Sequence, residues 1–288
     1  MNKTIITLLA AAILSGTAGI SAAENTQTFT GKISHLKSST GVNVTYIPTS
    51  SGSTTVKVTG PDEGVKLVKV DFDGSALSIY AKRGEGKTWT INGAKDLKGV
   101  TVTVTGPLIS SFQATSSGDI KCTSNLNYGK GTLTLDTSSS GDIKFADVSC
   151  GTVNATTSSS GDIALGKLTC SEARLTTSSS GDIDLNTLSA ITVAMTTSSS
   201  GDIDMETLKA TTVTAKASSS GEIHITTINS DLLEASASSS AEIKLGGGTV
   251  KAANLSTSSS ADIVARNVSF GNTNIQKSSG GSVKIGQK

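Results

Sequence analysis

The stretch TTSSSGDIDLNTLSAITVAMTTSSSGDIDM, Thr176–Met205, contains nearly the same phrase twice, with Asp182 and Asp202 at equivalent places. The same acidic position recurs along the chain at a constant interval of 20 residues. A fixed repeat of this length is typical of a solenoid, in which each repeat forms one coil and stacks on the next. The equivalent positions are Asp142, Asp162, Asp182, Asp202, Glu222, Glu242, Asp262 and Ser282.

The alternation inside each repeat predicts strands and not helices. Ile183 and Leu185 flank the polar Asp184, and a second apolar pair, Val193 and Met195, follows in the same repeat. Apolar residues at every second position indicate a strand with one buried face. The sequence therefore predicts an all-β fold, a single-stranded parallel β-helix, right-handed, with about 20 residues per coil.

The first residues have the pattern of a signal peptide, residues 1–23. Lys3 precedes a short apolar run, and small residues before Glu24 form a cleavage site. The apolar run is shorter than the ~20 residues that cross a bilayer, and no later segment is long enough. We therefore expect an exported chain without a transmembrane segment, located in the periplasm, on the outer surface or outside the cell.

The rest of the chain divides into two parts. Residues 24–113 keep the strand alternation but lack the repeat, which predicts an irregular N-terminal β region, or head, continuous with the solenoid. Residues 114–288 form the regular β-solenoid repeats.

The formal net charge is +1, so there is no electrostatic reason to expect nucleic acid as a partner. The sequence has no Cys/His metal motif, and it predicts no metal, no cofactor and no catalytic residue.

Acidic residues are densest in the middle of the repeats. Calcium prefers carboxylate ligands, but calcium-binding β-rolls repeat every nine residues with a glycine-rich motif that this chain lacks. Two interpretations remain: each carboxylate accepts backbone N–H bonds at its own corner, or the patch binds cations weakly. A polysaccharide-degrading enzyme would also place paired carboxylates here. The residues of this patch are Asp182, Asp184, Asp202, Asp204 and Glu206.

Cys150 and Cys170 occupy equivalent positions in consecutive repeats. Stacked Cα atoms lie ~4.8 Å apart, which is within the range that a disulfide requires. The same column continues with Ala190 and Ala210, so a small residue that fills a corner is the alternative interpretation.

The head contains the better candidates for a ligand-binding end. It holds the only tryptophan, Trp89, and the stretch SSTGVNVTYI, residues 38–47, which includes Gly41, Val42 and Asn43. This stretch is followed by VTVTGPLISSFQATSSGDIKC, residues 102–122, and then by the repeats. The order of these three segments resembles the bacterial auto-transporter adhesin family with a "head GIN domain". In this chain Val42 stands where the Gly-Ile-Asn motif of that family has isoleucine. The resemblance covers most of the chain. It implies a β-helix without an evident catalytic set that acts in cell adhesion.

These observations predict an exported, non-enzymatic β-solenoid that acts as a cell-surface or envelope adhesin. Its partner would be a polysaccharide or a protein, and the ligand-binding candidates are Gly41, Val42, Asn43 and Trp89. The alternative is a polysaccharide-binding or polysaccharide-degrading β-helix protein of the lyase or hydrolase kind. Strand edges at both ends of a solenoid also leave homo-oligomerisation open.

Overall fold

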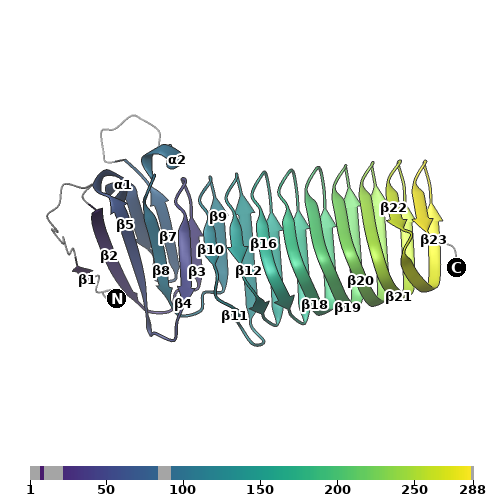
Figure 1. The fold of residues 1–288 in the computed structure, drawn as a ribbon, viewed down its shortest axis with the longest axis horizontal. Coiled ribbons are helices and arrows are strands. Elements are labelled where there is room, and N and C mark those ends of the chain that lie inside the picture. The colour runs from purple at the N-terminus through teal and green to yellow at the C-terminus, as the bar shows by residue number, and fades with distance from the viewer. Residues whose placement is uncertain (1–6, 10–21, 84–91, 287–288) are drawn as a thin grey trace.

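The computed structural model describes residues 7–9, 22–83 and 92–286, which form a long rod of β-strands (Figure 1). Strands account for 65% of the structure and helices for 4%, and the solenoid has about nine turns of ~20 residues. The predicted fold class, an all-β parallel β-helix, is confirmed. Most of the predicted signal peptide and Trp89 lie outside the described residues, so export remains a prediction.

Each coil contributes to two long sheets and to a short third side. In one coil, residues 183–185 belong to sheet A, Leu188 to the short side, and residues 192–197 to sheet B. Every position pairs in parallel with the equivalent position of the next coil, as Ile183 does with Ile203. Like side chains therefore stack in columns along the rod, which is why one sequence serves every coil.

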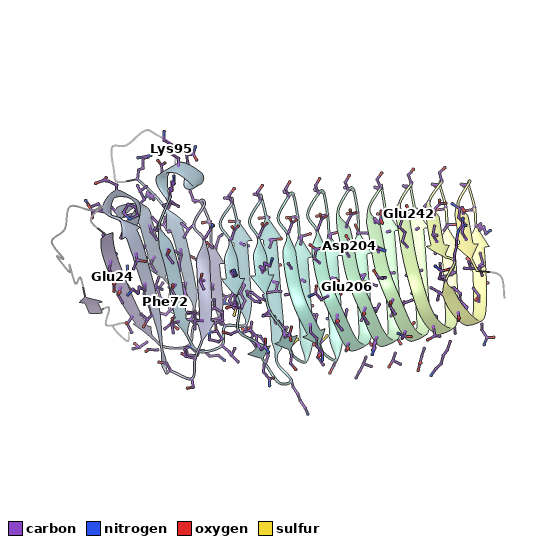
Figure 2. The ribbon with its side chains drawn as sticks, in the orientation of Figure 1. Glu24, Phe72, Lys95, Asp204, Glu206 and Glu242 are labelled. Carbon is purple, nitrogen blue, oxygen red and sulfur yellow. The ribbon has the colours of Figure 1, made fainter. Side chains whose placement is uncertain are left out.

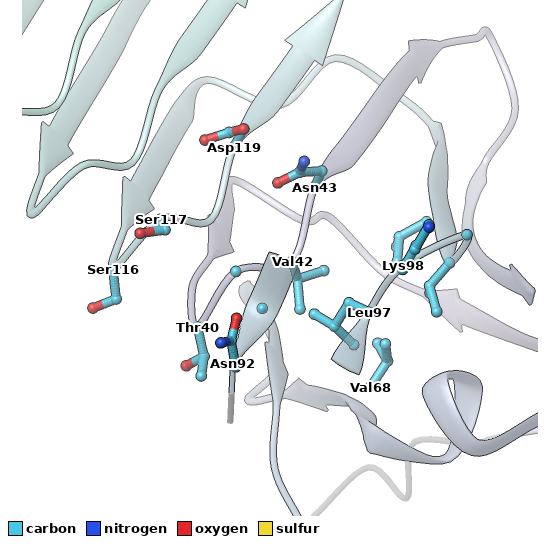
Figure 3. Close-up of a pocket in the computed structure, with 15 residues that line it drawn as sticks. Thr40, Val42, Asn43, Val68, Asn92, Leu97, Lys98, Ser116, Ser117 and Asp119 are labelled. Carbon is cyan, nitrogen blue, oxygen red and sulfur yellow. The ribbon is translucent and has the colours of Figure 1, made fainter. Parts of the chain in front are cut away.

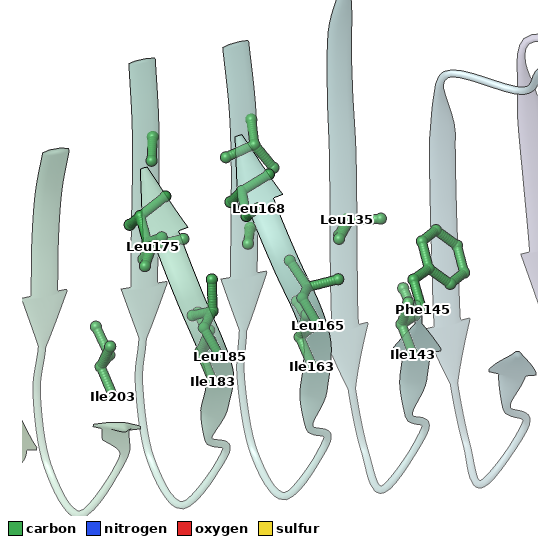
Figure 4. Close-up of a cluster of buried hydrophobic side chains, with 14 of the residues drawn as sticks. Leu135, Ile143, Phe145, Ile163, Leu165, Leu168, Leu175, Ile183, Leu185 and Ile203 are labelled. Atoms are coloured by element: carbon green, nitrogen blue, oxygen red, sulfur yellow. The ribbon is translucent and has the colours of Figure 1, made fainter. Parts of the chain in front are cut away.

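The columns of isoleucine and leucine fill the space between the sheets (Figure 4). Ile163, Ile183 and Ile203 are fully buried, and Leu165 and Leu185 are only 3% exposed. Complete burial of one such side chain stabilises the folded chain by about 1.5–3 kcal/mol. The described residues share one continuous core that runs from the head to the last coils.

The serine-rich corners have a strained backbone. Ser179 and Ser199 have φ values of 62° and 61°, a left-handed conformation that costs a non-glycine residue about 1–2 kcal/mol. The glycine at the end of each of these corners, Gly181 or Gly201, does not have a positive φ value. A Cβ on Gly181 would lie 2.7 Å from the carbonyl oxygen of Gly161, so the column needs small residues for close approach. Ala241 and Ala261 occupy this column in later coils and are buried, which fits the same requirement.

The head, predicted as residues 24–113, is not a simple continuation of the coils in chain order. Strands β3 and β4 form a coil that stacks on the coil of β9 and β10, and β3 also pairs with β7 and β4 with β8. The segment between β4 and β9 therefore folds back over the outer side of the first coil. Strands β2, β5 and β6 add antiparallel layers at that end of the rod.

The described residues 22–83 and 92–106 contain seven strands and two helices, and β1 (Thr7–Leu9) pairs with β2. None of the helices in the described ranges is long and apolar enough to cross a membrane. The elements are β2 (Ala22–Thr30), β3 (His35–Ser38), β4 (Val44–Pro48), β5 (Ser53–Pro61), α1 (Asp62–Leu67), β6 (Val68–Phe72), β7 (Ala76–Ala81), α2 (Gly93–Asp96) and β8 (Thr101–Gly106).

The solenoid strands are longest in the coils of β18 to β21, where one strand of 15–17 residues continues around the bend between the two sheets. They are β9 (Ser111–Thr115), β10 (Ile120–Cys122), β11 (Leu126–Asn127), β12 (Thr132–Ser138), β13 (Ile143–Phe145), β14 (Val148–Ser149), β15 (Thr152–Thr157), β16 (Ile163–Thr169), β17 (Glu172–Thr177), β18 (Ile183–Thr197), β19 (Asp202–Ser218), β20 (Glu222–Ser238), β21 (Glu242–Thr257), β22 (Asp262–Ala265), β23 (Val268–Lys277) and β24 (Ser282–Ile285).

Candidate functional site

The Gly41-Val42-Asn43 stretch is the first corner of the solenoid. Val44 pairs with Ile120, so Asn43 occupies the same column as Asp119. The backbone bonds fit this register: the Val44 N–H donates to the Asp119 carbonyl oxygen at 2.8 Å, and the Asp119 N–H donates to the Val42 carbonyl oxygen at 3.1 Å. Gly-Val-Asn therefore takes the place of Ser-Gly-Asp, with a neutral amide where later coils carry an acid.

Helix α2 packs directly on this first corner. A Cβ on Gly41 would lie 2.6 Å from the Cα atom of Gly93, and a Cβ on Gly93 would lie 2.7 Å from the Cα atom of Gly41. Gly41 is also left-handed, with a φ value of 73°. Only glycine permits this approach of two backbones, so both residues are needed to hold α2 against the corner.

The start of α2 is held by Asp96. Its carboxylate accepts a hydrogen bond from the Asn92 N–H at 2.9 Å and pairs with the Arg83 guanidinium at 2.8 Å. The bond from Asn92 and the charge of Arg83 hold the pKa of Asp96 below its usual value. The Asn92 side chain in turn accepts a bond from the Lys95 N–H at 3.4 Å, which caps the helix.

A pocket of about 940 Å³ lies between the first corner, the second corner and the α2 region (Figure 3). Figure 3 shows Val42, Leu97 and Val68 together on one side, with Thr40 and Asn92 on another. Three of the four predicted ligand-binding candidates, Gly41, Val42 and Asn43, line it. The other lining residues are Thr40, Val68, Asn92, Gly93, Leu97, Lys98, Gly99, Val100, Val102, Ser116, Ser117 and Asp119.

The pocket combines hydrogen-bonding groups with an apolar floor. Asn43, Asn92, Ser116 and Ser117 are exposed, whereas Val42 is buried. Such a mixture suits a polar ligand that is oriented by several hydrogen bonds and contacts a few aliphatic side chains.

Among the described lining residues there is one carboxylate, Asp119, and one ammonium group, Lys98. Burial raises the pKa of Asp119, which accepts a bond from the Asp142 N–H at 3.2 Å. A single carboxylate is one short of the pair that glycoside hydrolysis uses in most families.

The structure also shows what the sequence did not reveal. Trp89, the fourth ligand-binding candidate, lies outside the described residues and cannot be placed in the pocket. The contributions of Asn92, Leu97 and Lys98 were missed because nothing in the sequence indicated that the segment before β8 folds back over the first corner. A signal for part of the site was present: aligning Gly-Val-Asn-Val with Ser-Gly-Asp-Ile would have brought Thr40 beside Ser116.

The acidic column forms a hydrogen-bonded ladder. From Asp119 to Asp202, each carboxylate accepts a bond from the backbone N–H of the acidic residue one coil further on, not at its own corner as the sequence suggested. Parallel stacking places that N–H directly over the carboxylate. The donors are Asp142, Asp162, Asp182, Asp202 and Glu222, and the N–O distances are 3.0–3.2 Å.

The predicted cation patch spans this ladder and the neighbouring column of sheet A. Asp184 and Asp204 are direct partners on β18 and β19, and Asp204 also lies 3.2 Å from His224. Figure 2 shows Asp204 and Glu206 in the middle of the rod, away from the pocket. In the described part of the chain, no group of three or more His, Cys, Asp or Glu side chains is arranged to hold a metal ion. Weak cation binding by Asp182, Asp184, Asp202, Asp204 and Glu206 remains a prediction.

The acidic patch, which includes Asp184, makes part of the stability depend on pH. Burial, and after it the Asp204 carboxylate, raises the pKa of Asp184. A raised folded-state pKa contributes stability that is present below the unfolded value of about 3.9 and is lost as the pH rises through the folded value. Asp184→Asn should therefore stabilise the chain at pH 7, by about 0.2–1 kcal/mol for a like-charged strand pair, and have no such effect near pH 3. Thermal unfolding at both pH values measures this.

Asp231→Asn is the matched control, because Asp231 forms an ion pair with Lys251 at 2.7 Å and does not face another carboxylate across the strands. It should not stabilise the chain at pH 7. An equal gain for Asp184→Asn at pH 3 and pH 7 would contradict the charge-repulsion argument.

Cys150 and Cys170 lie next to each other as buried free thiols. A hydrogen bond between the two side chains lowers the pKa of Cys150 and raises that of Cys170. The two residues are therefore close together, as the stacking predicted, and a disulfide between them remains a prediction.

Several solved structures have a similar fold. A "putative adhesin" from Bacteroides fragilis is 18% identical, with a TM-score of 0.56 over 91% of this chain and 96% of the other. A "putative adhesin" from Parabacteroides merdae is 15% identical, with a TM-score of 0.64 over 88% and 95%. A "putative lipid binding protein" from Parabacteroides distasonis is 14% identical, with a TM-score of 0.55 over 92% and 97%. At these identities the likeness shows the fold alone.

A comparison with curated proteins finds no match. The family described as "Putative auto-transporter adhesin, head GIN domain" matches residues 33–218 and 193–288, which together cover the first corner, the pocket and the solenoid. The chain therefore belongs to the auto-transporter adhesin family with the head GIN domain, as its corner motif and its repeats had indicated.

Proposed function

We propose that this protein is an exported, non-enzymatic, adhesin-like interaction protein that takes its ligand in the pocket of the head. The observation that carries the proposal is the position of Gly41-Val42-Asn43. These residues form the one corner in the described structure that is covered by a helix, and the cover creates a pocket of about 940 Å³. Family membership and the β-solenoid fold support an adhesin-like role.

The chemistry of the pocket favours binding over cleavage. Its described side chains are mainly neutral hydrogen-bonding groups and aliphatic groups, and Asp119 is its single carboxylate. The Asp119 side chain is engaged by the Asp142 N–H. Hydroxyl and amide groups recognise sugars and peptide backbones equally well, so the ligand is a polysaccharide or a protein of another surface.

The rod carries this pocket near one of its ends. The pocket lies beside the antiparallel layers at one end, and the solenoid extends from there as a stiff spacer (Figure 1). A ligand-binding end on a rigid stalk suits attachment to another surface, and the family description supports a surface or exported location.

The first experiment is retention of the purified protein on a panel of immobilised bacterial and host polysaccharides, with new reducing or unsaturated ends measured in the same samples. We expect retention without cleavage. Asn43→Ala and Lys98→Ala should each weaken binding about three- to tenfold, the loss that one hydrogen bond in a site produces.

Asn186→Ala is the matched control, because Asn186 is an exposed asparagine on β18, several coils from the pocket. It should leave retention unchanged. Release of new ends would contradict the non-enzymatic assignment, and equal losses for Asn43→Ala and Asn186→Ala would contradict the assignment of the ligand to the pocket.

A further inference from the structure

The outer surface of sheet B carries a continuous column of polar side chains along the rod. Lys37 pairs with Gln113, and Gln113 pairs with Asp136. The column continues through one threonine in each of three coils and reaches Lys216. Six strand steps of ~4.8 Å separate the two lysines, which places them ~29 Å apart along one straight line.

The surface is hollowed at the head end of this column. A pocket of about 600 Å³ is lined by Lys37, Gln113 and Asp136 together with hydroxyl groups of neighbouring columns. Burial is the cause that raises the pKa of Asp136, with no hydrogen-bond or ion-pair partner contributing. Its carboxylate is therefore partly removed from water and available to accept hydrogen bonds from a ligand.

The surface is hollowed again at the other end of the same column. A second pocket, of about 410 Å³, is lined by Lys216, Ser236, Ser256 and Gln276, which follow one another in the column. The buried Leu255 lies beneath it. Each hollow is thus lined by one ammonium group and one carboxylate, Asp136 in the first and Glu234 in the second, together with hydroxyl and amide groups, and both hollows lie on one line.

Two lysines of sheet A, unlike Lys37 and Lys216, form ion pairs. Lys244 pairs with Glu222 at 2.9 Å, and Lys284 pairs with Asp262 at 2.9 Å. Among the described residues, neither Lys37 nor Lys216 has a carboxylate within ion-pair distance. These two cations of sheet A are neutralised by the fold, whereas Lys37 and Lys216 remain available to an anion.

We propose that the outer column of sheet B binds a linear anionic polysaccharide lengthwise. Carboxylate groups of its uronic acid units pair with Lys37 and Lys216. The hydroxyl groups in between hydrogen-bond to Gln113, Asp136 and the threonines, which repeat at a spacing close to the length of a sugar ring. This site is separate from the head pocket and does not depend on it.

Binding to alginate, a linear uronic acid polymer, tests the proposal by isothermal titration calorimetry, with the neutral linear polymer pullulan as the comparison. We expect alginate to bind, and the double variant Lys37→Ala/Lys216→Ala to bind about tenfold more weakly, the effect of two exposed ion pairs. The double variant Lys244→Ala/Lys284→Ala removes the same charge from sheet A and should bind as the unaltered protein does.

Oligomer length gives a second readout. A uronic acid tetrasaccharide is too short to reach both lysines, so Lys37→Ala and Lys216→Ala should each cost less with it than with the polymer. Absence of alginate binding, tighter binding of pullulan, or an equal loss in the sheet A double variant would overturn the proposal. If Asn43→Ala abolished alginate binding while the sheet B variant did not, the polymer would bind in the head, and the proposed function would stand without this site.

Discussion

Gly248→Ala should be the most damaging single methyl addition in the described solenoid. Gly248 has a φ value of 115°, and a Cβ there would lie 1.9 Å from the carbonyl oxygen of Ile228. The neighbouring atom is backbone within a parallel ladder, so it cannot rotate away as a side chain could. Adding the left-handed penalty to the cost of overpacking gives an expected destabilisation of about 2–5 kcal/mol.

Gly247→Ala is the matched control one residue away. Its nearest atom would be the Asn267 carbonyl oxygen at 3.6 Å, an ordinary contact, and its φ value is not positive. It should leave stability unchanged or raise it by no more than about 1 kcal/mol. Denaturant unfolding of the two variants measures the difference. A difference of less than 1 kcal/mol would contradict the strain argument.

The damage should also be local. Each coil contacts only its neighbours, so the coils on either side of Gly248 should open first, while the head remains protected. Hydrogen exchange measured by mass spectrometry should show faster exchange in residues 242–285 of the Gly248→Ala protein, with little change in residues 35–48. Uniform loss of protection would indicate that the rod unfolds as a single cooperative unit.

The same position shows the limit of the sequence pattern. In the column of Leu188, Leu208 and Ile228, the repeat alone would suggest that an apolar residue at 248 restores the core. The structure indicates the opposite, because a Cβ at Gly248 would collide with the carbonyl oxygen of Ile228. The 20-residue period and the alternation predict which residues share a column. They do not predict the main-chain conformation at a residue, such as Gly248, that departs from the residue type of its column.

The head shows a second limit. The solenoid could be predicted because each coil stacks on a coil of nearly the same sequence. The alternation within a coil and the 20-residue interval between coils are therefore enough to define the fold. The head has no such redundancy. Its first coil pairs with residues 76–79 and 102–106, which come later in the chain, and no local pattern encodes that order.

Finding the residues that line the pocket required both the sequence motif and the tertiary packing. Gly41, Val42 and Asn43 were found through the resemblance of their motif, and the register then showed that they are a corner like the others. Asn92 and Lys98 could not be found, because they reach the corner only through the packing of α2. Sequence therefore predicted three lining residues of the candidate pocket and missed the residues that cover it.

Phe112→Ala should weaken the junction between the head and the solenoid by about 3–5 kcal/mol, the usual cost of removing a buried aromatic ring. Phe112 is fully buried on β9. Its ring centroid lies 5.2 Å from that of Tyr46 in the first coil and 4.8 Å from that of Phe145 on β13. Removing the middle ring leaves a cavity between two coils that hold each other's position, and the strands around it are too constrained to close it.

Phe72→Ala is the control that separates this junction from the general loss of an aromatic pair. Phe72 packs against Phe29 with a centroid distance of 5.3 Å, but it lies on the outer strand β6 and is only partly buried. Its loss should therefore cost less than half as much in a denaturant titration. Phe112→Ala should in addition speed hydrogen exchange on both sides of the junction, in β4 and in β13, since the first coil and the solenoid lose the same contact. Equal costs for the two variants, or faster exchange confined to the head, would mean that the two parts are joined by their backbone ladders and not by the aromatic stack.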